Sequence, residues 1–150
     1  MPAGISIEIN EETVDMSTEI SLARATKAIE AGKADAAELG IPFTITIVDA
    51  GAHLLAVTRM DGAALVSVDA SHAKARTSVL FAQPTKGLAA AVQPGAPLYG
   101  IAAGSRDLMA FIAGGIPVID TDGRLVGAIG VAGGAPDNDH QVAEAVVSAL

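Results

Sequence analysis

The sequence predicts an α+β domain in which helices pack on an antiparallel sheet. Runs of alternating, β-branched residues are separated by short turns rich in Gly and Asp, which is typical of β-hairpins. Amphipathic stretches long enough for helices lie before, between and after these runs. Because tight turns rather than long crossovers join most of the strands, neighbouring strands are expected to run antiparallel. A length of 150 residues fits one such domain.

The first elements are an arm and a helix. Residues 1–16 are polar and acidic, and we interpret them as an arm or short edge strand; residues 17–150 then form a single domain. The helix is expected to begin after Ser17, because serine is a favourable N-cap. It is expected to end at Gly40, because glycine adopts the left-handed C-cap and Pro42 follows.

Five strands and three further helical segments are expected in the rest of the chain. The first two strands form a hairpin around Asp49-Ala50-Gly51, and the last three form a meander with a turn at Thr121-Asp122-Gly123. The expected strands cover residues 43–48, 53–58, 108–113, 116–120 and 125–132. The expected helices cover residues 63–81, 85–92 and a last segment that Asp137, Asn138 and Asp139 cap and that ends near residue 149.

Composition excludes several classes of function. The chain has 9 basic and 17 acidic residues and a net charge of -8, which argues against nucleic acid and anionic membranes as partners. It contains no cysteine, so disulfides, thiolate catalysis and Cys-ligated metals are excluded. No signal peptide or long apolar run is visible, and we expect a cytoplasmic protein. Because 51% of the residues are hydrophobic, we expect a homo-oligomer, a dimer or larger.

The glycines near the end of the chain favour close packing over nucleotide binding. Gly127, Gly130 and Gly133 do not fit a dinucleotide or P-loop motif. Asp137 and Asp139 at the next helix would repel a phosphate. We therefore expect something to approach the strand closely at Gly127 and Gly130.

Three histidines are present, and no two have the spacing of a helical metal pair. His53 follows a turn and is expected to be exposed. His72 and His140 lie on expected helices and are the candidates for binding a metal or haem iron. The cluster of Asp137, Asp139 and His140 fits either helix capping or ligand binding.

Arg59 and Asp61 lie where a strand ends and a turn begins. A guanidinium at that place can bind a carboxylate through two hydrogen bonds. In the structural alternative, Asp61 caps the next helix and Arg59 covers apolar surface. Lys74 and Arg76, on the following helix, add positive charge.

Several strings together resemble one known family. They are V-D-A-G at residues 48–51, R-M-D-G-A at 59–63, H-A-K-A-R-T at 72–77, G-G-I-P-V at 114–118 and G-A-I-G-V-A-G-G at 127–134, with Asp139 after the last. In this order they are similar to the GlcG/HbpS-like family, the haem-degrading domain family. The resemblance covers about residues 17–149. The sequence departs from the family at Ala132, where members usually have serine. It also has a low aromatic content, 3% of the residues.

The resemblance implies a profilin-like fold, a five-stranded antiparallel sheet with helices on both faces, and assembly into dimers or larger oligomers. Some members bind haem or are linked to haem degradation and iron; others belong to catabolic operons or are fused to cobalamin adenosyltransferases.

Three hypotheses for function follow. The first is a small oligomeric haem- or cofactor-binding protein whose ligand lies between sheet and helix. The second is a catabolic enzyme acting on a small hydroxy acid or other carboxylate, with Asp61 or Asp139 as catalytic candidates. The third is a non-catalytic accessory protein that stabilises an operon enzyme. The candidate ligand-binding residues are Arg59, Asp61, Lys74, Gly130, Gly133 and Gly134.

Overall fold

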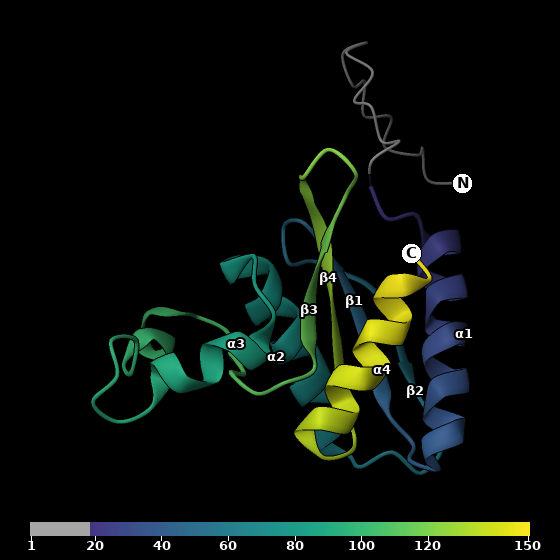
Figure 1. Ribbon diagram of the computed structural model, residues 1–150, viewed down its shortest axis with the longest axis horizontal. Coiled ribbons are helices and arrows are strands. Elements are labelled where there is room, and N and C mark those ends of the chain that lie inside the picture. Colours follow the sequence, from purple (N-terminus) through teal and green to yellow (C-terminus); the bar gives the residue numbers. More distant parts are fainter. Residues whose placement is uncertain (1–18) are drawn as a thin grey trace, which may run out of the picture.

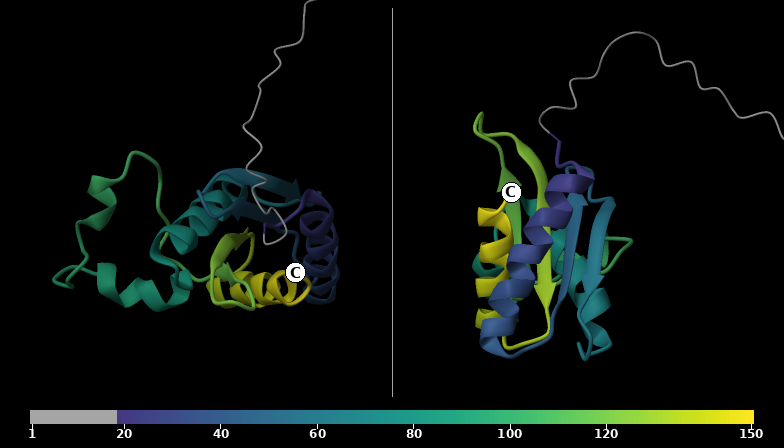
Figure 2. Two further views of the ribbon diagram at one scale, coloured as in Figure 1. Left: turned by 90° about the horizontal axis from the view of Figure 1, so that it is seen from above. Right: turned by 90° about the vertical axis from the view of Figure 1, so that its right-hand side faces the viewer.

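A computed structural model describes residues 19–150, and the arm expected over residues 1–16 lies outside the described residues. A four-stranded sheet lies between two layers of helices (Figures 1 and 2). Helix α2 (Val66–Phe81) covers one face of the sheet. Helices α1 (Leu22–Leu39) and α4 (Pro136–Ser148) pack against each other on the opposite face. The predicted α+β class is therefore confirmed.

The sheet is antiparallel throughout, in the order β2-β1-β4-β3. Its strands are β1 (Thr44–Asp49), β2 (Leu54–Arg59), β3 (Gly115–Ile119) and β4 (Leu125–Ala132). Strands β1 and β2 form one hairpin, and β3 and β4 form the other. The two hairpins meet in the middle of the sheet, where β4 pairs with β1.

An aspartate organises each hairpin turn. Asp49 Oδ1 accepts hydrogen bonds from the backbone N–H of Gly51 at 2.8 Å and of His53 at 2.9 Å. Burial raises the pKa of the Asp49 carboxyl, but these backbone donors outweigh it and hold that pKa below its ordinary value. Asp120 Oδ1 accepts in the same way from Asp122 and Arg124.

Helix α1 begins four residues later than the sequence predicts. Its N-cap is Ser21, whose hydroxyl accepts a hydrogen bond from the Arg24 N–H at 3.2 Å. Ser17, the predicted N-cap, lies outside the described residues. The predicted end is confirmed, because Gly40 takes the left-handed conformation at φ 67°.

The expected strand over residues 108–113 is wrong, and the sheet has four strands rather than five. Side chains from helices take the hydrogen bonds that a neighbouring strand would make. The Ala110 N–H donates to the Thr77 hydroxyl at 2.9 Å, and the Thr85 hydroxyl donates to the Ile112 carbonyl at 2.6 Å. The segment thus runs over the helices instead of joining the sheet.

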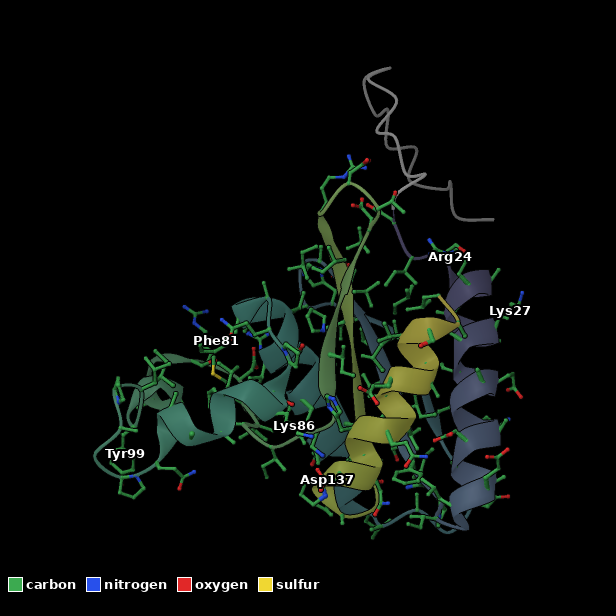
Figure 3. The ribbon with its side chains drawn as sticks, viewed as in Figure 1. Arg24, Lys27, Phe81, Lys86, Tyr99 and Asp137 are labelled. Carbon is green, nitrogen blue, oxygen red and sulfur yellow. The ribbon has the colours of Figure 1, made fainter. Side chains whose placement is uncertain are left out.

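Residues 82–114, between α2 and β3, project from the body of the domain, and we name them the α2–β3 excursion (Figures 1 and 3). They contain α3 (Thr85–Leu88) and two 3-10 turns, η2 (Ala89–Val92) and η3 (Ile101–Gly104). Phe81 and Phe111 meet edge to face at its base, with ring centroids 5.7 Å apart. Figure 3 shows Tyr99 at its far end.

The two faces of the sheet have different cores. Toward α1 and α4 the core is aliphatic and aromatic, with Phe43, Ile45 and Ile129 fully buried. Toward α2 it is built from small and hydroxyl-bearing residues. Thr44 and Ser67 hydroxyls lie 2.7 Å apart, and those of Thr46 and Ser71 lie 2.8 Å apart. These buried hydrogen bonds let α2 approach the sheet closely.

Gly130 makes that close approach possible. A Cβ at this position would collide with the Ser71 carbonyl oxygen and lie 2.5 Å from the Ala75 backbone nitrogen. The expectation of a close approach at Gly130 is confirmed, and it is the facing helix α2 that makes it. At Gly127 the crowding comes from elsewhere, because a Cβ there would meet the Val48 carbonyl of the neighbouring strand and Ile20.

Within residues 19–150, no helix is both long enough and apolar enough to cross a bilayer.

Candidate functional site

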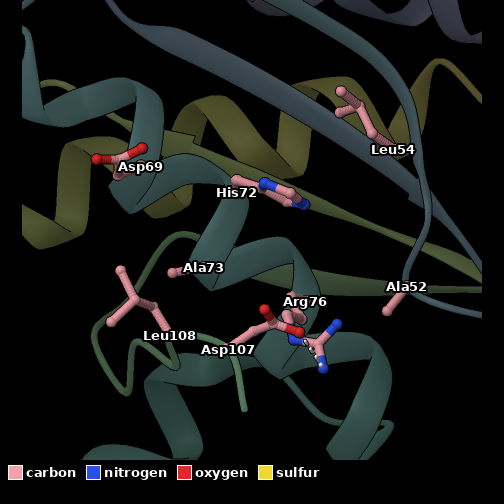
Figure 4. A pocket seen from close by; sticks show the side chains of 8 residues that line it. All are labelled: Ala52, Leu54, Asp69, His72, Ala73, Arg76, Asp107 and Leu108. Atoms are coloured by element: carbon pink, nitrogen blue, oxygen red, sulfur yellow. Dashed lines mark ion pairs between the residues drawn. The ribbon is translucent and has the colours of Figure 1, made fainter.

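A pocket of about 300 Å³ opens on the outer side of α2 (Figure 4). Helix α2 forms one wall, the β1–β2 hairpin a second, and the α2–β3 excursion a third. Its lining residues are Ala52, Leu54, Asp69, His72, Ala73, Arg76, Asp107 and Leu108.

Helical spacing gathers the polar groups of the α2 wall. Asp69, His72 and Arg76 are three and four residues apart, so they share one face of the helix. The opposite face carries Ser67, Ser71 and other buried residues that meet the sheet. One helix therefore fixes both the core contact and the pocket wall.

Arg76 is the charged centre of this pocket. Its Nη2 lies 3.3 Å from the Asp107 carboxylate on the excursion, and the two side chains are 24% and 65% exposed. The Arg76 Nε is buried and has no hydrogen-bond partner among the described residues. A buried donor left without a partner is costly, so an acceptor that displaced the groups covering this nitrogen would gain a hydrogen bond there.

His72 and two leucines complete the chemistry of the pocket. The His72 imidazole is exposed toward it. Leu54 and Leu108 are 54% and 73% exposed, so both leave apolar surface open at the pocket. The pocket thus combines an imidazole, a guanidinium and apolar walls, as ligand sites commonly do.

Arg59 and Asp61 line a different pocket, of about 400 Å³, together with Lys33, Thr58 and Met60. No ion pair joins Arg59 to Asp61 within residues 19–150. Asp61 does not cap α2, since the helix begins at Val66 after Leu65 and has no side-chain cap.

Lys74 is not beside Arg59 and Asp61 but inside the protein. Its Nζ lies 2.6 Å from Asp139 Oδ2, and both side chains are about 5% exposed or less. The same nitrogen donates to the Val131 carbonyl at 3.1 Å, and Asp139 Oδ1 accepts from the Gly134 N–H at 2.8 Å. Asp139 therefore does not cap α4 through its side chain; it joins α4 to α2, and the N-cap is Ala135.

The glycines of the family-like strings lie close to other parts of the chain, and Gly114 lies against this ion pair. A Cβ on Gly114, where φ is 124°, would lie 3.0 Å from Lys74 Nζ and 2.9 Å from the Asp139 Cβ. A Cβ on Gly133 would lie 2.6 Å from the Pro42 carbonyl, and one on Gly134 would lie 3.1 Å from Phe43. Gly130, Gly133 and Gly134 thus provide packing space, and they line none of the pockets described here.

The other two histidines are not among the lining residues of the pocket that contains His72. His53 is exposed beside Asp49 in the β1–β2 turn. His140 lines a pocket of about 420 Å³ with Pro84, Ile116 and Glu144, and its Nε2 lies 3.5 Å from the Glu144 carboxylate. The described part of the chain contains no group of three or more residues with the side chains of a metal site.

Asp69 and Asp107 are site residues that sequence reasoning did not select. The spacing of His72 and Arg76, four apart on a helix, was a local signal for the α2 wall. No pattern in the neighbouring residues indicates that Asp107 lies beside Arg76. The two meet only because the α2–β3 excursion folds back toward α2.

The fold and this pocket define a class: a small α+β domain with a pocket between a helix and a hairpin. Comparison with known proteins makes the class specific. The sequence model of the family described as "Haem degrading protein HbpS-like" matches residues 20–148. The chain belongs to this HbpS-like family, and the resemblance stated from its motifs is confirmed.

Individual relatives agree with that assignment. A protein of Citrobacter freundii, "Uncharacterized 15.0 kDa protein in dhaT-dhaS intergenic region", is 40% identical over 125 residues, which cover 83% of this chain and 87% of that protein. Protein GlcG of Escherichia coli K12 is 36% identical over 118 residues, covering 77% and 84%. The crystal structure of a PduOC–haem complex matches with a TM-score of 0.82 and 31% identity, covering 88% of this chain and 95% of that one.

Proposed function

We propose that this protein binds haem in the pocket formed by α2, the β1–β2 hairpin and the α2–β3 excursion. The observation that carries the proposal is the Arg76 guanidinium, with its buried, unpartnered Nε, four residues from the exposed imidazole of His72. A related protein of similar fold has been crystallised as a haem complex, and the family description names haem degradation.

The residues present fit the chemistry of haem. Imidazole is a common iron ligand, and a guanidinium can bind a propionate carboxylate through two parallel hydrogen bonds. Leu54 and Leu108 offer apolar surface to a macrocycle. In this arrangement His72 would hold the iron, Arg76 would orient a propionate, and the leucines would exclude water from one face of the ring. When bound, haem would supply an iron centre capable of ligand binding and electron transfer.

The size of the pocket indicates how the ring would be held. About 300 Å³ is at the lower end of the range of roughly 300–1,000 Å³ for small-molecule sites. One chain therefore encloses only part of a macrocycle. The exposed leucines on the rim leave apolar surface that a second copy of the chain would cover.

Titration with hemin tests the proposal. We expect a saturable shift of the Soret band at low micromolar hemin, and a changed Soret position with at least about tenfold weaker binding in His72→Ala, because the iron ligand is lost. His140→Ala is the matched control, because His140 lies on α4 and lines a different pocket, and it should leave the titration unchanged. Absence of a saturable shift, or a His72→Ala spectrum identical to that of the native protein, would overturn the proposal.

A second candidate function is binding of a small carboxylate between Arg59 and Lys33. Both cations line one pocket, in a protein whose net charge is -8, and Arg59 has no ion-pair partner within residues 19–150. A bidentate contact should not survive Arg59→Lys, because lysine lacks the planar fork. Calorimetric titration with glycolate should then give heat that the variant loses; equal heat from both proteins would exclude the site.

A further inference from the structure

The contact between Arg76 and Asp107 uses only half of the available hydrogen-bonding edge. Nε and Nη2 share one edge of a guanidinium, and a carboxylate binds best when it accepts from both nitrogens. Asp107 lies 3.3 Å from Nη2, whereas Nε has no partner among the described residues. The arrangement resembles a bidentate site that a protein carboxylate fills imperfectly.

The chain around Asp107 is held loosely. Ser105 N–H donates to the Ala102 carbonyl before it, and Ala110 N–H donates to Thr77 after it. Between these two anchors the described hydrogen bonds include none, and both Asp107 and Leu108 are exposed. The ion pair with Arg76 is therefore the main polar contact that ties residues 106–109 to α2. An ion pair this exposed contributes little to stability, so breaking it is cheap.

We infer that Asp107 is a built-in competitor for the carboxylate of the ligand: a ligand carboxylate takes both Nε and Nη2 of Arg76 and displaces Asp107. This inference rests on the proposed haem site and adds a residue that sets its specificity. When a ligand carboxylate replaces the Asp107 carboxylate, the charge beside Arg76 is unchanged and a hydrogen bond to Nε is gained. A ligand without a free carboxylate leaves Asp107 in place and gains nothing at Arg76.

Comparison of hemin with hemin dimethyl ester, which has no free carboxylate, tests this inference. In Asp107→Asn the competitor has lost its charge, so hemin should bind about fivefold more tightly, while the dimethyl ester should bind as it does to the native protein. In Arg76→Gln the preference for hemin over its dimethyl ester should disappear. Asp69→Asn is the matched control: it removes one negative charge from the same pocket, and its carboxylate makes no ion pair within residues 19–150.

The outcomes separate the two proposals. If hemin binds and depends on His72, but Asp107→Asn leaves hemin affinity unchanged or lowers it, the competition is wrong and the haem site stands. If Asp69→Asn strengthens hemin binding as much as Asp107→Asn does, the effect is a general one of charge on an anionic ligand, and the competition is again wrong. If hemin fails to bind to the native protein at all, the proposed function itself fails.

Discussion

At the scale of single residues, Lys74 and Asp139 show how a buried ion pair is satisfied. Each charge leaves water almost completely, which is expensive unless partners replace the lost hydration. Here the ammonium contacts a carboxylate and a carbonyl, and the carboxylate accepts from two donors. The pair joins α2 to α4 around the end of β4, so it links the two helical layers.

Removal of one partner should be strongly destabilising. Lys74→Met leaves Asp139 buried without its counter-charge, and we expect a loss of about 3–5 kcal/mol in the free energy of unfolding, measured by urea denaturation. The double variant Lys74→Met with Asp139→Leu should recover much of that loss, because no isolated charge remains. A single variant as stable as the native protein would show that the pair is not needed for the fold.

The glycine at position 130 permits a second test at this scale. Gly130→Val forces a side chain against the Ser71 carbonyl and the Ala75 nitrogen, both of which are backbone atoms that cannot rotate away. We expect a loss of about 3 kcal/mol, at the upper end of the usual effect of overpacking. Gly100→Ala is the control, since a Cβ there meets nothing within 4 Å; equal melting temperatures for the two variants would refute the crowding.

At the scale of elements, each hairpin depends on an aspartate that accepts backbone hydrogen bonds across its turn. The backbone N–H of Arg124, together with its guanidinium and the N–H of Asp122, holds the pKa of the Asp120 carboxyl below its ordinary value of about 3.9. The folded state therefore favours the ionised form. This contribution is present above the ordinary pKa and is lost as the pH falls through the lower pKa of the folded state.

Asp120→Asn should therefore lower the melting temperature at pH 7, and the difference from the native protein should shrink steadily below about pH 4. Thermal unfolding measured from pH 7 to pH 2.5 provides the test. Asp61→Asn is the control for loss of a surface carboxylate, because Asp61 accepts no such turn hydrogen bonds among residues 19–150. A gap for Asp120→Asn that widens on acidification would contradict this assignment.

Elements whose ends carry a local signal could be predicted from sequence, and those held by distant side chains could not. The C-cap at Gly40 and the turn at Asp49 are encoded by neighbouring residues, so the elements beside them were predicted within a few positions. Residues 108–113 have the apolar composition of a strand, but Thr77 and Thr85 take their backbone hydrogen bonds. Likewise Lys74 and Asp139 are 65 residues apart, and nothing local shows that they meet.

At the scale of the whole molecule, we propose the α2–β3 excursion as the surface for self-association. No charged residue lies between Lys86 and Arg106, in a chain whose net charge is -8. Two copies would therefore repel each other least along this stretch. Tyr99 and Ile101 expose 63% and 39% of their surface on it, and burial of such side chains favours association.

We predict that light scattering at micromolar concentration gives the mass of a dimer or larger assembly. Tyr99→Glu places a negative charge on the excursion and should shift the population toward the 14.9 kDa monomer. Leu22→Glu is the matched control, since Leu22 is equally exposed but lies at the start of α1. A native protein that scatters as a 14.9 kDa particle would contradict self-association; equal masses for the two variants would place the contact elsewhere.

The hydroxyl pairs under α2 have a consequence for how the pocket adapts. Two buried hydrogen bonds fix α2 on the sheet: one joins the Thr44 and Ser67 hydroxyls, and the other joins those of Thr46 and Ser71. Any slide or roll of α2 would break both of them together. We therefore expect the backbone that carries His72 and Arg76 to keep its position when a ligand binds. On the facing wall, Asp107 and Leu108 lie between the hydrogen bonds of Ser105 and Ala110, and no buried hydroxyl pair holds them among the described residues. We therefore expect ligands of different width to be accommodated by displacement of Asp107 and Leu108, while α2 keeps its position on the sheet.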